Sequence, residues 1–330
     1  MRKTAGMAIT FAATLLMAGS ALAQDTITVG MAGGVNQVPS LVAADQGFFK
    51  EEGLNVDIKP VPRGNIAIEA IIAGSMQFAE VSEVALLSAV DKGIPLLAVA
   101  AASRGFTGKM VGANDLGEVK DIADLKGKRI GIQVGTGVHG VFLMLLKKKG
   151  LSQDDFNIAN VRVNDMPTAM SSPGTFDAVF GWDPMMQRTV QAGYGKEVIS
   201  ADQFQKMAGI TYPLVLVADK AWVEKNRETV QHFVNAYAKA QKWIRENPEK
   251  ALDLYAGYIE KAGAPLDKEI VRNMMFEVDK FPGVEFIDSD WSELADTRDF
   301  LKENGQISTS PDIKAITDTS FGDKAEASLK

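Results

Sequence analysis

Residues 133–142 read QVGTGVHGVF and hold three glycines, Gly135, Gly137 and Gly140, in the spacing G-x-G-x-x-G. A strand-like run precedes them and an apolar, helix-like run follows, a context typical of a dinucleotide-binding fingerprint. In such a fingerprint, N–H groups at the helix start hold a pyrophosphate, and a later acidic residue, here Asp165, contacts the ribose. A helix N-terminus also favours other small anions. The stretch therefore predicts an anion-binding site, which could belong either to an NAD-dependent enzyme or to a binding protein.

Polar and aromatic side chains also stand at four other turns that follow strand-like runs. Ligands of open parallel sheets bind beyond the carboxyl ends of the strands, so these turns are expected to line one cleft. The five turns carry Asn36 and Gln37, Arg63 and Asn65, Ser82 and Glu83, Thr136 to His139, and Trp182 with Asp183. The residues predicted to contact a ligand are Asn36, Gln37, Ser82, Glu83, Arg104, Thr136, Gly137, Val138, His139, Trp182 and Asp183.

The glycine turn has a structural interpretation beside the binding one. The amides of residues 137–139 head a helix and favour an anion there. The Thr136 hydroxyl can donate to that anion, or it can cap the helix while the glycines merely form a tight turn. His139, standing alone, fits a packing or capping role better than that of a general base.

Each of the remaining candidate residues likewise has both a ligand-binding and a structural interpretation. Trp182 can form one wall for an organic ligand or fill the core between lobes. Asp183, followed by Pro184, also has the pattern of a helix N-cap. Glu83 stands at a helix start, where it either complements the helix dipole or accepts from a ligand's donor. Arg104 can supply a fixed positive charge for an anion, or it can remain solvated.

Composition limits the chemistry further. The 330-residue chain has no cysteine and only two histidines, His139 and His232, which excludes thiolate sites and argues against a multi-histidine metal site. It contains no G-x-S-x-G, P-loop or H-E-x-x-H motif. The formal charge of −7 argues against nucleic acid or an anionic membrane surface as the main partner. We therefore expect a protein that is not an enzyme and needs no cofactor and no metal.

Residues 1–23 have the pattern of a secretory signal peptide. Arg2 and Lys3 are followed by an apolar run over 7–17 and by Ala-Leu-Ala directly before Gln24. We expect cleavage near Gln24 and a periplasmic location for the mature chain.

The elements that position the five turns alternate short β-rich runs with helical patterns, which indicates an α/β fold with mostly parallel sheets. We expect strands over 26–32, 55–61, 76–81, 94–102, 128–134, 160–165 and 176–182, a return crossing over 209–216, and helices thereafter. The second α/β unit is then inserted into the first. Lobe I comprises 24–113 with 215–330, and lobe II comprises 114–214. Two crossings join the lobes and can act as a hinge.

Four stretches, in this order, resemble the periplasmic solute-binding proteins of ABC importers for nitrate, sulfonate and taurine: VPSLVAADQGFFKEEGLNVDI, DIADLKGKRIGI, GTGVHGVFLMLLKKKGL and DAVFGWDP. The resemblance implies a two-lobed type II binding protein that closes on a small ligand and presents it to an inner-membrane ABC permease. Family pockets use the turns that here carry Asn36 and Gln37, Ser82 and Glu83, Thr136 to His139, and Trp182 with Asp183. We expect a monomer.

The chain departs from the family pattern near the pocket. Glu80 stands where an apolar residue is common, and Val84 and Ala85 stand where prolines are usual. An extra carboxylate favours an organic ligand that carries an anionic group and a donor, such as an aminosulfonate. The predicted function is capture of a small organic anion of the sulfonate or taurine type. The alternatives are nitrate or a nitrogen-containing heterocycle in the same role, an exported hydrolase, and the NAD-dependent exported enzyme. Against the last, Asp165 lies 25 residues beyond Gly140, far for a ribose contact.

Overall fold

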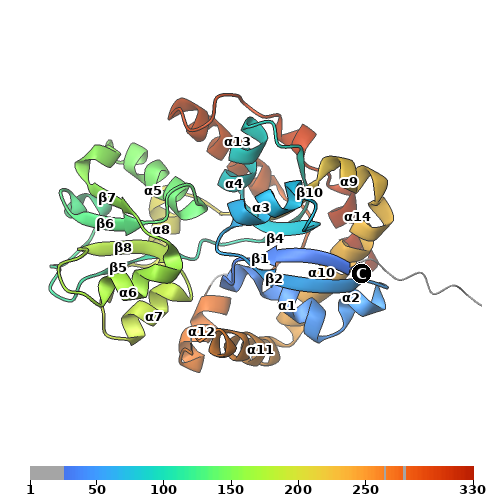
Figure 1. The fold of residues 1–330 in the computed structure, drawn as a ribbon, viewed down its shortest axis with the longest axis horizontal. Coiled ribbons are helices and arrows are strands. Elements are labelled where there is room, and N and C mark those ends of the chain that lie inside the picture. Colours follow the sequence, from blue (N-terminus) through green and yellow to red (C-terminus); the bar gives the residue numbers. More distant parts are fainter. Residues whose placement is uncertain (1–25, 264, 278–279) are drawn as a thin grey trace, which may run out of the picture.

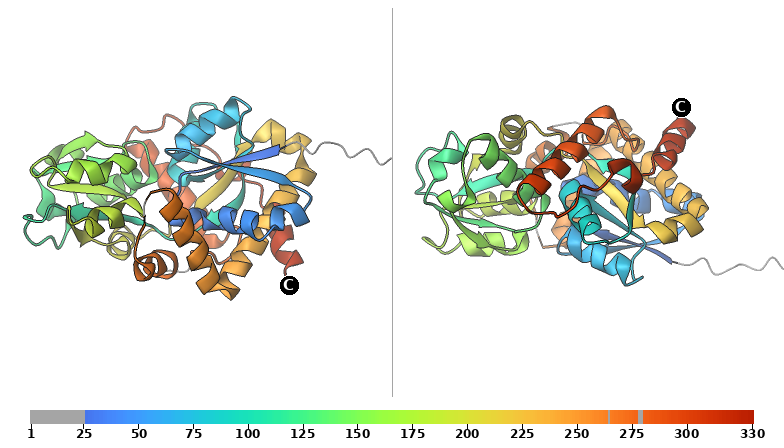
Figure 2. Two further views of the ribbon diagram at one scale, coloured as in Figure 1. Left: turned by 60° about the horizontal axis from the view of Figure 1, so that its bottom comes forward. Right: turned by 90° about the horizontal axis from the view of Figure 1, so that it is seen from above.

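The computed structural model describes residues 26–263, 265–277 and 280–330, so the predicted signal peptide (1–23) and the cleavage site near Gln24 lie outside the described residues. The described chain forms two lobes, each built on one five-stranded sheet (Figure 1). The middle of the chain, green in Figure 1, forms one lobe, and the two ends together form the other. Figure 2 shows the same separation from two further directions. Within the described ranges, none of the helices combines the length and apolarity that a membrane crossing requires.

The first sheet has the strand order β2-β1-β3-β10-β4. β1 pairs in parallel with β2 and β3, and β10 runs antiparallel between β3 and β4. The carboxyl ends of the first three strands therefore meet at one edge, where ligands of such sheets bind. The strands are β1 (Thr26–Met31), β2 (Asn55–Pro60), β3 (Phe78–Ser82), β4 (Leu96–Ser103) and β10 (Leu214–Asp219).

The second sheet has the order β7-β6-β8-β5-β9 and repeats the plan of the first. β6 pairs in parallel with β7 and β8, and β5 runs antiparallel between β8 and β9. In each sheet the single reversed strand is the first one after a crossing, so the prediction of mostly parallel sheets is confirmed. The strands are β5 (Gly108–Gly112), β6 (Arg129–Ile132), β7 (Asn157–Asn160), β8 (Ala178–Trp182) and β9 (Lys196–Ile199).

Two sequence expectations about these strands are wrong. β5 pairs with β8 in the second sheet, so residues 108–112 belong to lobe II and not to lobe I, and the chain crosses earlier than residue 113. The run 160–165 is not a strand, because β7 ends at Asn160 and Val163–Asp165 form a 3-10 turn. There the Val163 N–H donates to the Gln133 side chain (2.9 Å) instead of to a neighbouring strand.

Alternate residues of the first sheet face two different cores, as strand geometry requires. Phe78 stacks on Phe233 of α10 with ring centroids 4.1 Å apart, whereas its neighbour Ala79 packs on the opposite face. The face of Phe78 is covered by α1 (Val38–Asp45), α2 (Phe48–Glu51), α9 (Lys220–Lys225), α10 (Arg227–Glu246), α11 (Pro248–Lys261), α12 (Lys268–Phe276) and α14 (Ser320–Ser328). The other face is covered by α3 (Gly64–Ile72), α4 (Glu83–Asp91) and α13 (Asp288–Glu303).

The second sheet is likewise enclosed on both faces. Phe180 packs toward α5 (Gly137–Lys148) and α8 (Ala201–Ala208), and the adjacent Val179 packs toward α6 (Met166–Met170) and α7 (Met185–Gln191). Because both sheets are covered on both faces, their strand-end turns are the places left for binding.

The two crossings, residues 104–107 and 209–213, lie side by side. The Gly105 N–H donates to the Thr211 carbonyl (2.9 Å), and the ring of Phe106 packs edge-on against Tyr212 with centroids 4.9 Å apart. Tyr212 has a φ of 53°, in the left-handed region that non-glycine residues rarely adopt. Such strain is typical of functional positions that the surrounding structure holds in place.

Candidate functional site: the cavity between the lobes

A cavity of about 90 Å³ lies where the strand-end turns of both sheets meet the two crossings. This volume is well below the roughly 300 Å³ at the lower end of ordinary ligand pockets, so the cavity as it stands admits a small molecule. Seven of the predicted site residues line it: Asn36, Gln37, Ser82, Thr136, Gly137, Val138 and Trp182. Their contact with a ligand remains a prediction.

The lobe II side of the cavity is the N-terminus of α5. Gly135 has a φ of 78°, which turns the chain after β6, and Thr136 then precedes the first helical residue in extended conformation. The first N–H groups of an α-helix have no acceptor within the helix, so those at the start of α5 are available to an anion. The Thr136 hydroxyl does not cap α5 but donates to the Gln133 carbonyl (2.7 Å), which braces the turn.

Gly137 is needed because lobe I and the second crossing approach α5 closely. A Cβ atom at this position would lie 1.9 Å from the Tyr212 hydroxyl oxygen and 2.9 Å from the Ser82 Cβ atom. Ser82 in turn caps α4 by accepting from the Ala85 N–H (3.3 Å). The α-carbon of Gly137 is therefore covered by protein, whereas the second glycine of a dinucleotide fingerprint lets the backbone approach the pyrophosphate.

Asn36 and Gln37 line the lobe I side, but their amide nitrogens are already engaged. The Asn36 Nδ2 donates to the carbonyls of Arg104 (3.3 Å) and Gly105 (3.1 Å), which ties this turn to the first crossing. The Gln37 Nε2 donates to the Glu80 carbonyl (3.2 Å). The Gln37 Oε1 also accepts from the Gly34 N–H (3.3 Å), so both side chains hold the cavity wall in shape, and the Asn36 side-chain oxygen is the atom that remains for another partner.

Arg63 and Asn65 also line the cavity, although the sequence placed them only at a strand-end turn without a binding role. The Asn65 Nδ2 donates across the cleft to the Gly135 carbonyl (3.3 Å), linking the two lobes. Arg63 is half-buried, and within the described residues its guanidinium has no protein oxygen as acceptor. A half-buried guanidinium without a counter-charge is suited to hold an anion.

Glu80 also lines the cavity, but the Oε2 atom of its carboxyl is buried without a hydrogen-bond partner. It is 2% exposed, and its Oε1 accepts from the Ser40 hydroxyl. Burial raises the pKa of Glu80 to about 8, and interactions with the hydroxyls of Ser40 and Tyr237 offset only part of that rise. At neutral pH this group is therefore mainly a neutral carboxylic acid.

Trp182 ends β8 and faces lobe I. Its Cδ1 lies 3.7 Å from where a Gly34 Cβ atom would stand, so the indole closes against the turn that follows β1. It lines the small cavity and also a second, larger hollow. Trp182 therefore forms a wall at the lobe interface, and its contact with a ligand stays a prediction.

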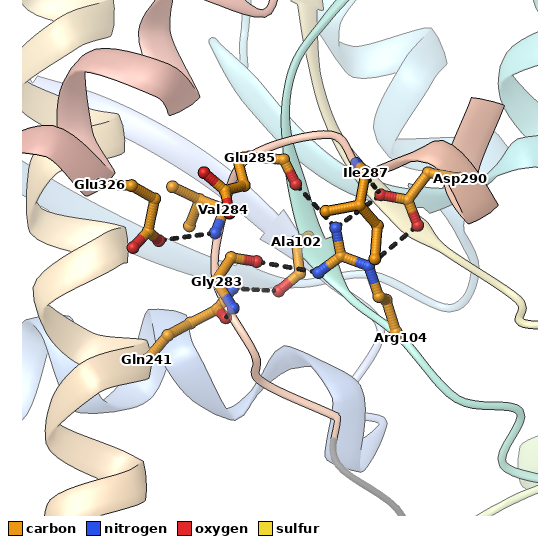
Figure 3. A network of polar contacts seen from close by, with 9 residues as sticks. All are labelled: Ala102, Arg104, Gln241, Gly283, Val284, Glu285, Ile287, Asp290 and Glu326. Atoms are coloured by element: carbon orange, nitrogen blue, oxygen red, sulfur yellow. Dashed lines mark hydrogen bonds and ion pairs between the residues drawn. The ribbon is translucent and has the colours of Figure 1, made fainter.

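Arg104 does not line the cavity, which corrects the prediction that it offers charge to a ligand. Its Nε donates to the Asp290 Oδ1 (2.9 Å), and its Nη2 pairs with the Oδ2 of the same carboxylate (2.5 Å). Figure 3 shows the guanidinium turned toward this carboxylate, and its remaining N–H groups donate to the carbonyls of Gly283 (3.1 Å) and Glu285 (2.7 Å). Because every part of the guanidinium is engaged, Arg104 fastens the end of β4 to the segment before α13.

Glu83 is buried and lies outside the cavity lining, so its predicted role toward a ligand's donor is not supported. Burial raises its pKa well above the usual range, and the neighbouring Glu293 raises it further. Glu293 accepts from the Thr211 N–H in the second crossing (3.2 Å). This pair of carboxyls belongs to the packing around the hinge.

His139 and Asp183 also lie outside the lining of the cavity. The His139 Nδ1 accepts from the Gly135 N–H (3.4 Å), and burial lowers the pKa of the imidazole, so the ring is a neutral brace for the glycine turn. Asp183 is buried beside the Lys109 ammonium (2.9 Å). It also accepts from the Gln187 N–H in the first turn of α7 (3.3 Å), which resembles the helix-capping role that the sequence offers as an alternative. Burial lowers the pKa of Lys109, but Asp183 and Glu197 outweigh it and raise the pKa overall.

Among the described residues, no three or more histidine, aspartate and glutamate side chains lie close enough together to bind a metal ion. The cavity instead offers helix N–H groups, one unengaged guanidinium and an indole face. This set can hold a small anion by one end and meet an organic body with the other.

Two α/β lobes of identical strand order, closing on a cavity at their strand ends, define the two-lobed type II periplasmic-binding-protein fold. Residues 35–251 match the family described as NMT1/THI5 like, and the chain belongs to this family. It is 26% identical over 228 residues to a putative binding protein of Brucella abortus, covering 69% of each chain. It is 25% identical over 310 residues to the taurine-binding periplasmic protein of Escherichia coli, covering 91% of this chain and 95% of that one.

Solved structures agree with the fold. The alkanesulfonate-binding protein of Xanthomonas axonopodis, bound to MOPS, superposes with a TM-score of 0.75 at 17% identity, covering 89% of this chain and 99% of that one. The family also contains a relative named as an enzyme. A 4-amino-5-hydroxymethyl-2-methylpyrimidine phosphate synthase of Aspergillus parasiticus is 25% identical over 244 residues, covering 70% of each chain.

Proposed function

We propose that this protein captures a small organic anion of the sulfonate or taurine type between its two lobes and delivers it to an ABC permease in the inner membrane. One observation carries the proposal. The N-terminus of α5 and the guanidinium of Arg63, which no protein oxygen engages in the described residues, line the same small cavity. The names of the Escherichia coli and Xanthomonas relatives support the ligand class. The signal-peptide pattern of residues 1–23 supports a periplasmic location.

Capture needs several of the cavity groups together. A helix N-terminus favours an anion by only about 0.3–2 kcal/mol, whereas micromolar binding corresponds to about −8 kcal/mol. Arg63 and the hydrogen bonds of the α5 N–H groups add to the helix dipole, and closure strengthens all three by removing water. We therefore propose that lobe I (26–103 with 214–330) and lobe II (108–208) close about the paired crossings.

The NAD-dependent alternative fits the cavity poorly. The Tyr212 hydroxyl lies over Gly137, where a dinucleotide's pyrophosphate would have to approach the backbone. A volume of about 90 Å³ also holds far less than a dinucleotide. A pyrimidine ligand is the alternative that a relative supports, because the Aspergillus protein carries a pyrimidine in its name.

The first test is a thermal-shift screen of the mature protein against taurine, ethanesulfonate, nitrate, a 4-aminopyrimidine and NAD. Binding to the native state raises the melting temperature by mass action. A shift with ethanesulfonate or taurine is the expected result, and a shift with NAD alone would overturn the proposal. The ligand's affinity is then measured for Trp182→Ala, with Tyr194→Ala, an exposed aromatic of lobe II, as the matched control. Equal affinity in both variants would show that the ligand binds elsewhere.

A further inference from the structure

A second hollow of about 300 Å³ adjoins the small cavity at the lobe interface. Its walls come from both lobes: the ends of β1 and β2 and helix α11 from lobe I, and the start of α7 from lobe II. Trp182 and Ala32 line both hollows, so the two spaces meet at these residues. Ala32 belongs to lobe I and Trp182 to lobe II, so opening of the lobes would part this boundary.

The second hollow contains a half-buried arginine without a counter-charge. The only side-chain contact of the Arg188 guanidinium within the described residues is with the Met185 sulfur (3.8 Å), a weak acceptor. Tyr258 of α11 lines the same space and stacks on Tyr255 with ring centroids 6.3 Å apart. The Tyr255 hydroxyl donates to the Gly33 carbonyl (3.2 Å) and so fixes the turn that follows β1. The hollow therefore combines one free cation with an aromatic, fixed wall.

Arg63 and Arg188 differ from the other arginines of the described chain. Each of the others donates to a protein oxygen: Arg104, Arg129, Arg162, Arg227, Arg245, Arg272 and Arg298. The two that do not are Arg63 and Arg188, and each lines one of the two hollows that share Trp182. Exposure to solvent does not explain why Arg63 and Arg188 lack a protein acceptor, because exposed arginines such as Arg129 and Arg162 donate to protein oxygens.

We propose that the two hollows form one bipartite site for an organic dianion. One anionic group lies against Arg63 and the start of α5, the other lies against Arg188, and Trp182 covers the linker between them. This inference rests on the proposed function and names its ligand class more narrowly. The open state admits the linker between Ala32 and Trp182, and closure brings the indole onto it. A guanidinium in a partly dry site binds an anionic oxygen more strongly than a neutral group, so both charges contribute to affinity.

Calorimetry with two matched series tests the proposal. The probes are terminal alkanedisulfonates from ethane to hexane and the monosulfonates of the same chain lengths. At one length, the one that spans the two arginines, we expect the disulfonate to bind the wild type about tenfold or more tightly than its monosulfonate. Arg188→Gln should abolish this ratio and Arg188→Lys should restore part of it. Arg129→Gln, which removes the same charge from the exposed amino end of β6 in the same lobe, should leave the ratio intact.

The two proposals fail in different ways. If no probe of either series binds, the proposed function itself is wrong. If monosulfonates bind but no disulfonate binds more tightly, or if the ratio survives in Arg188→Gln, the bipartite site is overturned while the proposed function stands. Melting temperatures of the variants, compared with that of the wild type, establish that each one is folded before its affinity is read.

Discussion

Two arginines at strand ends of the first sheet occupy opposite environments. Arg104 follows β4 and is 7% exposed, with Asp290 and two carbonyls taking up its guanidinium (Figure 3). Arg63 follows β2, is half-buried, and has no protein acceptor within the described residues. Burying a charge is costly unless it is paired, so removing the engaged arginine would leave Asp290 unpaired and destabilise the fold, whereas the unengaged arginine is free for a ligand. Substitutions should therefore separate into effects on stability around Arg104 and effects on affinity around the cavity.

The largest effect on stability is expected from Arg104→Met. It leaves the fully buried Asp290 carboxylate without its cation, and breaking a buried pair in this way costs about 3–5 kcal/mol. Urea unfolding measures the loss. The double variant Arg104→Met with Asp290→Leu should recover part of it, because no buried charge is then left unpaired. Recovery stays partial because Asp290 also accepts from the Ile287 N–H (3.0 Å). A single variant as stable as the wild type would contradict the comparison.

Glu80→Gln should change the dependence of stability on pH. Burial raises the pKa of Glu80 to about 8 in the folded protein, so the folded state keeps a proton that the unfolded state loses above pH ~4.5. Wild-type stability from this group is fully present below pH ~4.5 and falls as pH rises through about 8. The glutamine variant lacks that fall and should be more stable than the wild type by roughly 1–4 kcal/mol at pH 9, with the difference vanishing toward pH 4.

Unfolding free energies of both proteins at a series of pH values provide the check. Ser40→Ala is the matched control, because it removes the hydroxyl that Glu80 accepts from and keeps the titrating carboxyl. A difference between wild type and Glu80→Gln that is constant with pH would mean that Glu80 is ionised in the folded protein at neutral pH.

Sequence reasoning located the strand ends well and the partners of their side chains poorly. Hydrophobic runs and glycines mark where parallel strands end, so the sequence predicts a cleft at the turns after β1, β2, β3, β6 and β8. The sequence places Arg63 at one of these turns and Arg104 directly after a strand, and it predicts a ligand contact only for Arg104. What separates them is Asp290, 186 residues further along the chain from Arg104. No local pattern encodes a contact of that range, so the sequence alone cannot show that Arg104 is engaged by protein and that Arg63 is not.

The same limit explains β5. Residues 108–112 read GKMVG, a short run that gives no reason to prefer one lobe over the other. Only pairing with β8 across a long sequence separation assigns it to the second sheet. For Gly137 the sequence marks the right position, because the G-x-G-x-x-G spacing identifies the turn. The reason that a glycine is needed there is not local, because it is the Tyr212 hydroxyl of the second crossing that leaves no room for a Cβ atom.

Gly137→Ala should affect both stability and affinity. The added Cβ atom would lie 1.9 Å from the Tyr212 hydroxyl oxygen, so either the crossing or the start of α5 must move. Overpacking of this kind costs about 1–3 kcal/mol, and the displaced N–H groups should weaken binding of whichever anion the screen identifies. Gly257→Ala is the control, because no atom lies within 4 Å of its added Cβ in helix α11. It should be neutral or slightly stabilising, since alanine is the better helix former. Wild-type behaviour of Gly137→Ala would show that the crossing is not held against α5.

Arg63→Gln should have the smallest effect on stability and a clear effect on binding. No protein oxygen loses a partner when the guanidinium is removed, so the free energy of unfolding should stay within ~0.5 kcal/mol of the wild type. The anion loses a charge-assisted contact, and its affinity, measured by calorimetry, should fall about tenfold or more. Arg104→Met should show the reverse pattern: a large loss of stability, with the N–H groups at the start of α5 and Arg63 still in place to bind the anion. If Arg63→Gln lost stability instead and bound the anion as tightly as the wild type, an arginine without protein partners would no longer mark the ligand site, and both hollows would have to be reassigned.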